Sequence, residues 1–321
     1  AMNLSTAFDG DNGFVLFHAI VSYSLLGLSL FLNTLVFYLV RVSRKIDGFR
    51  YVFYTYCIAN IIFAFLFSTT LTQWYNGAGF AVFFPTGPFA DIEQLIRIVF
   101  RLQTLSYIFV MSLVCATFVY RYLVVTRPTA NGLIAKALSS LMFFPVTLWL
   151  VDNSLIKVPD EQLRRRISNE LGNRFPLDFN TIHLFAIETK SFEHDLLQII
   201  GSFVTLLQIN LMIFIMLWAG LRIYQKIQTS GGSNRSKANE RNAFRLLLSQ
   251  AINPIILLHT PSFLNFLQTE FVDLPEAVNK CACIVMNLFT VTNPLLNIFL
   301  TKDLTNSLMR RKKSSISMAQ I

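Results

Sequence analysis

Long apolar blocks alternate with short polar segments along the chain. Each block has about 20 or more residues, enough for a helix to cross a hydrocarbon core of about 30 Å. The strands of a membrane β-barrel would be about half as long and would alternate in polarity. We therefore predict an all-α membrane protein, a seven-transmembrane helix bundle whose transmembrane domain covers residues 14–300. The predicted spans are residues 14–40, 49–71, 95–123, 137–156, 196–221, 244–267 and 278–300.

Two of these blocks contain charged or helix-breaking residues. The third opens with Arg97 and Arg101, and the sixth contains His259 together with prolines. A count of five or six spans would discard one of these blocks, and we predict seven. Proline cannot donate the backbone hydrogen bond of a helix, so kinks are expected within the spans. The prolines concerned are Pro145, Pro254, Pro261 and Pro294.

The distribution of Lys and Arg predicts the orientation. Segments 1–13, 72–92 and 268–277 contain neither residue, whereas the inner loop 222–243 and the tail 301–321 contain many. We therefore predict an extracellular N-terminus (1–13) and a cytoplasmic C-terminal tail (301–321). The outer loop 157–195 carries six basic and seven acidic residues. Since its charges nearly cancel, we expect it to form a small folded cap.

The composition agrees with a membrane protein and limits the classes of partner that we expect it to bind. Apolar residues make up 54% of the chain and charged residues 14%, against about 25% charged in ordinary soluble domains. The net charge of +9 is concentrated in the predicted inner segments, so it indicates contact with anionic membrane lipids, and no nucleic acid is expected. The sequon at Asn3 lies on the predicted outer side and is a candidate glycosylation site.

The sequence contains no arrangement of side chains that is typical of catalysis or of metal binding. The four cysteines all lie in apolar blocks without metal-ligand spacing, so we interpret them as reduced, buried side chains. No hydrolase or phosphate-binding motif is present, and Asp152 is the only carboxylate inside a predicted span. We predict no catalytic residue, no metal and no cofactor. A proton-coupled transporter would need a carboxylate near mid-membrane. No predicted span has one there, which argues against a transporter of this class.

Polar residues in the outer half of the spans are candidates for ligand binding. Glu93, Arg97 and Arg101 follow one another at steps of four and share a helix face. These arginines could anchor a ligand carboxylate, or could pair with Glu93 and reach lipid headgroups. His259 could line a pocket or form a hydrogen bond between helices. The candidate ligand-binding residues are Arg97, Arg101, Gln73, Tyr107, His259 and Asn287.

Several stretches, in chain order, carry a resemblance to a known family. They are Asp47-Gly48-Phe49-Arg50-Tyr51, Phe118-Val119-Tyr120-Arg121-Tyr122, Phe144-Pro145, the run from Ala243-Phe244-Arg245 to Gln250 followed by Pro254 and Pro261, and Asn293-Pro294. In their order and spacing they resemble the nematode seven-transmembrane chemoreceptors of the Str superfamily. The chain departs from rhodopsin-like receptors, because segment 157–195 has no cysteine to form a disulfide with the third span.

The resemblance implies a G-protein-coupled receptor in the plasma membrane, specifically the ciliary membrane of sensory neurons. It implies that a small odorant or pheromone binds in the outer half of the bundle and that a heterotrimeric G protein binds the inner face. The residues expected to meet the G protein are Tyr120, Arg121, Tyr122, Arg127, Arg222 and Arg241. The alternatives are a ligand-gated ion channel of the odorant-receptor type and a transporter.

Overall fold

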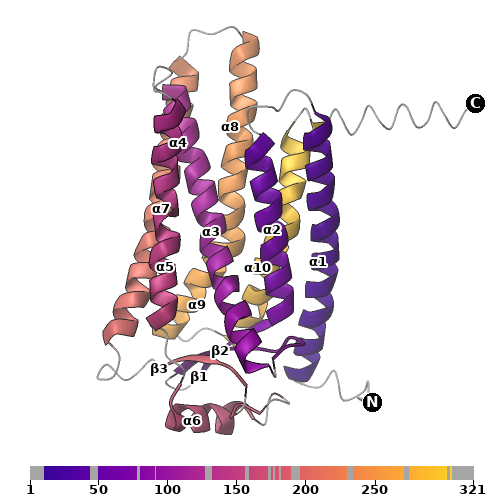
Figure 1. The fold of residues 1–321 in the computed structure, drawn as a ribbon, viewed down its shortest axis with the longest axis vertical. Helices are drawn as coiled ribbons and strands as arrows, with labels where there is room; N and C mark the ends of the chain where they lie inside the picture. The colour runs from indigo at the N-terminus through magenta and orange to yellow at the C-terminus, as the bar shows by residue number, and fades with distance from the viewer. Residues whose placement is uncertain are drawn as a thin grey trace, which may run out of the picture.

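Helices run side by side along the long axis of the molecule, and a small sheet with a short helix closes one end (Figure 1). The computed structural model describes residues 11–43, 50–77, 80–90, 92–126, 132–155, 159–172, 175, 178–180, 182–188, 196–229, 234–270, 275–301 and 304–305. Most of these residues are helical, which confirms the prediction of a mainly helical protein.

Among the described residues, five helices are long and apolar enough to cross a membrane. Their apolar length favours a helix because a helix satisfies its backbone hydrogen bonds internally, as a segment in lipid must. These helices are α1 (Asp11–Val42), α2 (Arg50–Thr70), α3 (Glu93–Thr126), α7 (Leu196–Thr229) and α10 (Glu276–Leu300).

The predicted fourth and sixth spans are helical but interrupted. In the first of them, α4 (Gly132–Ser140) leads through a 3₁₀ turn (Leu141–Phe143) into α5 (Phe144–Leu155). Pro145 is the second residue of α5, where a missing amide hydrogen costs least. In the other, α8 (Asn234–Pro254) leads through a π-helical turn (Ile255–His259) into α9 (Thr260–Glu270). These interruptions lie next to Pro145, Pro254 and Pro261, whereas α10 runs through Pro294 without an interruption.

The predicted inner loop 222–243 is largely helical. Helix α7 continues to Thr229 and α8 begins at Asn234, so helix covers 222–229 and 234–243. Helix therefore continues from both sides into the segment predicted as the inner loop. The physical reason is that apolar length measures the thickness of the hydrocarbon core, whereas a helix can continue as a polar extension into water.

A three-stranded antiparallel sheet is the feature that the all-α prediction did not include. Strands β1 (Thr72–Gly77) and β2 (Phe80–Pro85) form a hairpin, and β3 (Phe185–Glu188) pairs with β2. Leu71, which joins α2 to β1, has a positive φ of 44°. That conformation is unusual for a bulky residue, and it turns the chain from the helix axis into the sheet.

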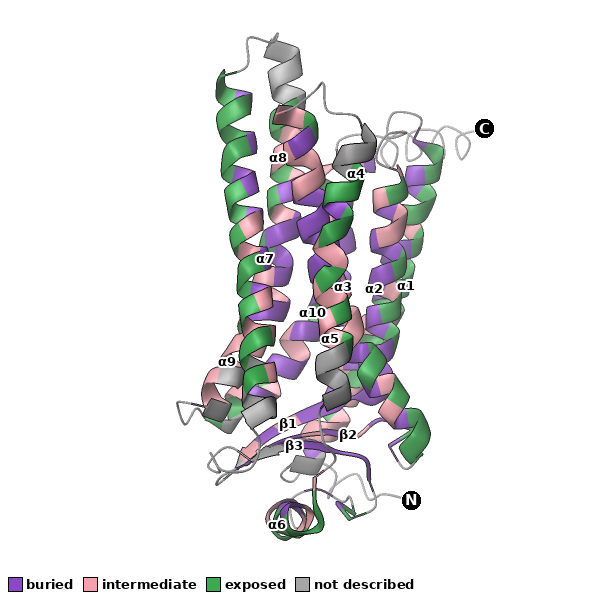
Figure 2. Ribbon diagram, turned by 60° about the vertical axis from the view of Figure 1, so that its left-hand side comes forward, coloured by how far each residue is buried: buried purple, intermediate pink, exposed green. Residues whose placement is uncertain are grey.

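The sheet and α6 (Glu161–Leu171) form a cap over one end of the helices (Figures 1 and 2). Asp160 begins α6 by accepting a hydrogen bond from the Leu163 amide at 2.7 Å. The cap has an apolar core of its own, in which Phe84 meets the rings of Phe175 and Phe179 at 5.0 and 5.2 Å. The described part of segment 157–195 is therefore folded, as its balanced charge indicated.

The outward faces of the helices are apolar and exposed, whereas the inward faces are buried (Figure 2). On α7, Leu207 and Phe214 are 69% and 64% exposed, and on α1 Phe31 is 65% exposed. A protein surrounded by water rarely exposes so many large apolar side chains along one face. This surface is the one that lipid would cover in a membrane-spanning bundle.

Candidate functional site

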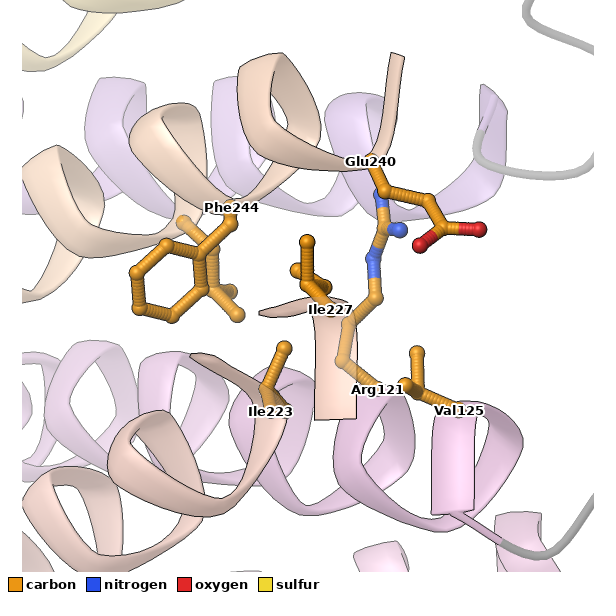
Figure 3. A pocket seen from close by; sticks show the side chains of 7 residues that line it. Arg121, Val125, Ile223, Ile227, Glu240 and Phe244 are labelled. Carbon is orange, nitrogen blue, oxygen red and sulfur yellow. The ribbon is translucent and has the colours of Figure 1, made fainter. Parts of the chain in front are cut away.

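At the end of the bundle opposite the cap, three helices enclose a pocket with an empty volume of about 280 Å³, counted out to open solvent. Most of its lining is apolar, and its two charged side chains are Arg121 and Glu240. Figure 3 shows the Arg121 side chain extending from α3 toward Glu240 on α8. The lining residues are Arg121 and Val125 from α3, Ile223 and Ile227 from α7, and Glu240, Phe244 and Leu247 from α8.

The pocket combines a half-buried cation with a deeply buried apolar floor. Ile223, Ile227 and Leu247 are only 3–4% exposed, while the Glu240 side chain is exposed at the rim. If the end of α8 that lines this pocket moved away from α3, Arg121 and this floor would become accessible together. Such a surface suits a partner helix that has an apolar face and acceptor groups at its end.

The other residues predicted to meet the G protein are absent from the pocket lining where the structure describes them. Tyr122 packs against Trp218 on α7 with ring centroids 4.9 Å apart, and the Arg222 guanidinium lies 5.9 Å from the same Trp218 ring. Arg241 donates to Gln228 Oε1 at 3.4 Å and so connects α8 to α7. Tyr120 is half-buried on α3. Arg127 and Asn3 lie outside the described residues.

Glu240 and Phe244 were missed as site residues by the sequence analysis. Phe244 was named only as part of the stretch from Ala243 to Gln250 that resembles the Str superfamily, and Glu240 was predicted to lie in the inner loop 222–243. The four-residue step between them was a signal that both lie on one helix face. That signal could be used only if the helix was known to begin before residue 244.

Two of the predicted ligand-binding residues instead connect the other elements to α1. The Gln73 amide nitrogen lies 2.8 Å from His18 Nδ1, which links β1 to α1. Asn287 donates to Ser22 Oγ at 2.8 Å, which links α10 to α1. Both amides are at most 4% exposed. Hydrogen bonds of this kind stabilise the contacts between neighbouring helices in a bundle.

Tyr107 and His259 form a second group, deeper in the bundle. Tyr107 on α3 is 6% exposed, packs against Trp149 at 6.0 Å, and lies within reach of Ser262. His259 precedes Ser262 by three residues, so both are on adjacent turns of one face. Among described residues, neither Tyr107 Oη nor His259 Nδ1 has a hydrogen-bond partner of regular geometry. Both are buried polar groups, and Ser262 lies close to the Tyr107 hydroxyl.

Arg97 and Arg101 form a third group at the start of α3, beside the cap. Arg97 pairs with Glu93 at 2.8 Å, and the two side chains are 43% and 56% exposed. Arg101 is exposed. The six predicted ligand-binding residues therefore fall into three groups by their contacts. Within the described part of the chain, no group of three or more His, Cys, Asp or Glu side chains is arranged to hold a metal ion.

Comparison with known proteins identifies the family of the chain. No curated protein matches the sequence. The model of the serpentine type 7TM GPCR chemoreceptor Str family matches residues 18–309, a stretch from within α1 to beyond α10. It includes the Arg121 pocket, the cap and both interrupted helices. The chain therefore belongs to the serpentine 7TM GPCR chemoreceptor family Str.

Proposed function

We propose that this protein is a chemosensory G-protein-coupled receptor that binds a small odorant or pheromone in the outer half of its bundle and activates a heterotrimeric G protein. The observation that carries the proposal is the Arg121 pocket, which lies between the inner ends of α3, α7 and α8 in a member of a receptor family. The family is one of receptors, which favours signalling over an enzymatic activity.

The proposal includes seven spans, an extracellular N-terminus and a cytoplasmic tail. It adds the interrupted helices α4–α5 and α8–α9 to the five uninterrupted candidates. The positive-inside rule supports the orientation, since segments 72–92 and 268–277 have no Lys or Arg. On this arrangement the cap faces outside and the Arg121 pocket faces the cytoplasm. We place the receptor in the plasma membrane of nematode sensory neurons, in their cilia.

We assign the ligand to the space around Tyr107 and His259. A buried polar atom without a partner costs about 1–3 kcal/mol, and a ligand that supplies the partner recovers this free energy. Trp149 and Phe263 lie next to the pair and provide aromatic walls. A small, mainly apolar molecule with one carbonyl or hydroxyl group fits these surroundings.

Signal transfer would use the π-helical turn between α8 and α9. His259 is its last residue, and the Thr260 amide bonds back to Ile255 over five residues. Such turns weaken the regular ladder of helix hydrogen bonds and serve as hinges. A ligand on His259 would shift a pre-existing equilibrium toward the packing in which the inner end of α8 lies away from Arg121.

The test is ligand-dependent nucleotide exchange on Gα in reconstituted membranes. We expect Arg121→Ala to abolish exchange while ligand binding persists, and Glu240→Gln to raise exchange without ligand, because the rim of the closed pocket loses a charge. Lys226→Gln is the matched control, since Lys226 is an exposed inner residue of α7 outside the pocket lining.

Two results would overturn the proposal. One is a folded protein that binds a ligand to which cells respond but drives exchange on no Gα subtype. The other is a ligand-gated current in oocytes that needs no G protein, which would identify a channel. Tyr107→Phe tests the ligand site separately, and we expect it to weaken agonist binding about tenfold, the effect of one lost hydrogen bond.

A further inference from the structure

His183 lies where the cap meets the first turns of α3, and its side chain has an unusual environment. It is 2% exposed, and neither ring nitrogen has a hydrogen-bond partner among the described residues. One nitrogen of a neutral imidazole donates and the other accepts, so two polar atoms are buried without partners. Native proteins seldom leave such atoms unpaired unless a ligand or water pairs with them.

Positive charge surrounds this imidazole. Arg97, Arg101 and Arg164 are all close enough to act on His183 electrostatically, and Glu93 is the one acidic side chain that does so among the described residues. Glu93 pairs with Arg97. Arg164 is occupied, because its Nη1 donates to backbone carbonyls. The guanidinium of Arg101 makes no hydrogen bond or ion pair to a described residue. One cation is therefore left to bind an anion.

Aromatic rings complete the surroundings. Phe185, two residues after His183 on β3, stacks on Phe100 of α3 with ring centroids 4.5 Å apart. The His183 ring meets Phe185 edge-on at 4.7 Å. Phe100 directly precedes Arg101 in α3, so the apolar pair lies on a face of the helix next to the face that carries the cation. The site thus offers positive charge, an unpaired imidazole and an apolar side.

We propose that Arg101 and His183 bind a small organic carboxylate at the junction of α3 and the cap. The carboxylate would accept hydrogen bonds from the Arg101 guanidinium and from one ring N–H of His183, with its short apolar tail toward Phe100 and Phe185. A guanidinium matches the two oxygens of a carboxylate geometrically.

This site is distinct from the one assigned to the odorant and is independent of G-protein coupling. Tyr107 follows Arg101 by six residues, which is about 9 Å along a helix. A lipid phosphate could also reach Arg101, as arginines near an interface often extend toward headgroups. The proposal commits to a free carboxylate, because the His183 ring is only 2% exposed and a phospholipid headgroup has little access to it.

The experiment measures butyrate binding to the full-length protein in nanodiscs of zwitterionic phosphatidylcholine, by calorimetry and without G protein. Methyl butyrate is the uncharged control ligand. We expect butyrate to bind at least tenfold more tightly than its ester, and Arg101→Gln and His183→Phe each to weaken it at least tenfold. His183→Phe keeps a ring against Phe185 and removes no hydrogen bond to a described residue, so the fold should persist.

Arg165→Gln is the matched control, since Arg165 is a cap arginine whose side chain is 78% exposed. Equal loss in Arg165→Gln and Arg101→Gln would show only a general electrostatic field and would overturn the site. Equal binding of butyrate and its ester would do the same. If phosphatidylserine in the nanodisc abolished butyrate binding, the occupant would be a lipid headgroup. None of these results depends on nucleotide exchange, so failure here is separate from failure of the proposed receptor function.

Discussion

The fold of the cap depends on one arginine, which can be removed selectively. Arg164 on α6 is half-buried, and its Nη1 donates to the backbone carbonyls of Phe179, Asn180 and Ile182 at 3.0, 3.1 and 2.9 Å. Ile182 directly precedes His183, so this arginine fixes the chain that leads into β3. We consider the substitution Arg164→Gln, with Arg165→Gln as its control.

The expected cost follows from the number of hydrogen bonds. Nη1 carries two hydrogens, so three acceptors share at most two strong bonds, and each bond from a charged donor contributes about 1.5–3 kcal/mol. Glutamine can restore one weaker bond, so Arg164→Gln should destabilise this part of the cap by about 2–3 kcal/mol. The control loses only a 3.8 Å ion pair to Glu161, with both side chains at least 78% exposed. Such pairs contribute about 0–1 kcal/mol.

Hydrogen exchange measured by mass spectrometry on residues 182–188 is the suitable assay, because it reports local opening. A loss of about 2–3 kcal/mol corresponds to exchange about 30- to 150-fold faster in Arg164→Gln, with little change in Arg165→Gln. The core of the helices should be little affected, since the cap core is a separate cluster. If exchange in the two variants agreed within twofold, Arg164 would not be what fixes this segment, and the reasoning would fail.

Three further predictions test other parts of the structure. Burial first, and then the neighbouring arginines, lower the pKa of His183 to about 4. Because this imidazole takes up a proton near pH 6.5 in the unfolded chain, the stability of the cap should fall as the pH drops from 6.5 toward 4. His183→Phe should make cap stability less dependent on pH, as measured by urea titrations followed by a fluorophore on the cap. Gln250→Leu removes a 2.7 Å hydrogen bond to a buried amide of α10 and should cost about 1 kcal/mol, seen as a lower melting temperature in detergent, unlike an exposed substitution on the same helix. Gly87→Ala would place a Cβ against the Thr69 carbonyl oxygen and should lower the yield of folded protein, whereas Gly27→Ala, with open space around it, should not.

The helices were predictable from the sequence, but their ends and the sheet were not. Apolar length fixes where a chain can cross lipid, and the seven predicted ranges all contain helix. Strands β1 and β2 lie in a segment whose lack of Lys and Arg indicates only its side of the membrane. Their partner β3 lies about a hundred residues further along the chain, and a single sequence does not reveal such pairing.

The candidate sites were predictable only as single residues. Arg121 was predicted from the family resemblance to meet the G protein, and it lines the pocket at the end of the bundle opposite the cap. The side chains that complete each site come from distant segments. Glu240 reaches the Arg121 pocket from α8, and His183 belongs to the cap whereas Arg101 is on α3. Spacing along one helix shows which residues share a face, whereas contacts between segments depend on the packed fold.

The middle of the bundle suggests why the two ends could communicate at modest energetic cost. The polar contacts between helices here use amides and hydroxyls. Asn60 on α2 donates to Asn33 on α1, and Thr292 on α10 donates to Asn253 on α8. Hydrogen bonds between membrane helices contribute about 0.6 kcal/mol on average, so exchanging a few of them costs less than breaking buried ion pairs. We therefore expect the two packings of α8 to differ by only a few kcal/mol, a gap that one small ligand on His259 can reverse.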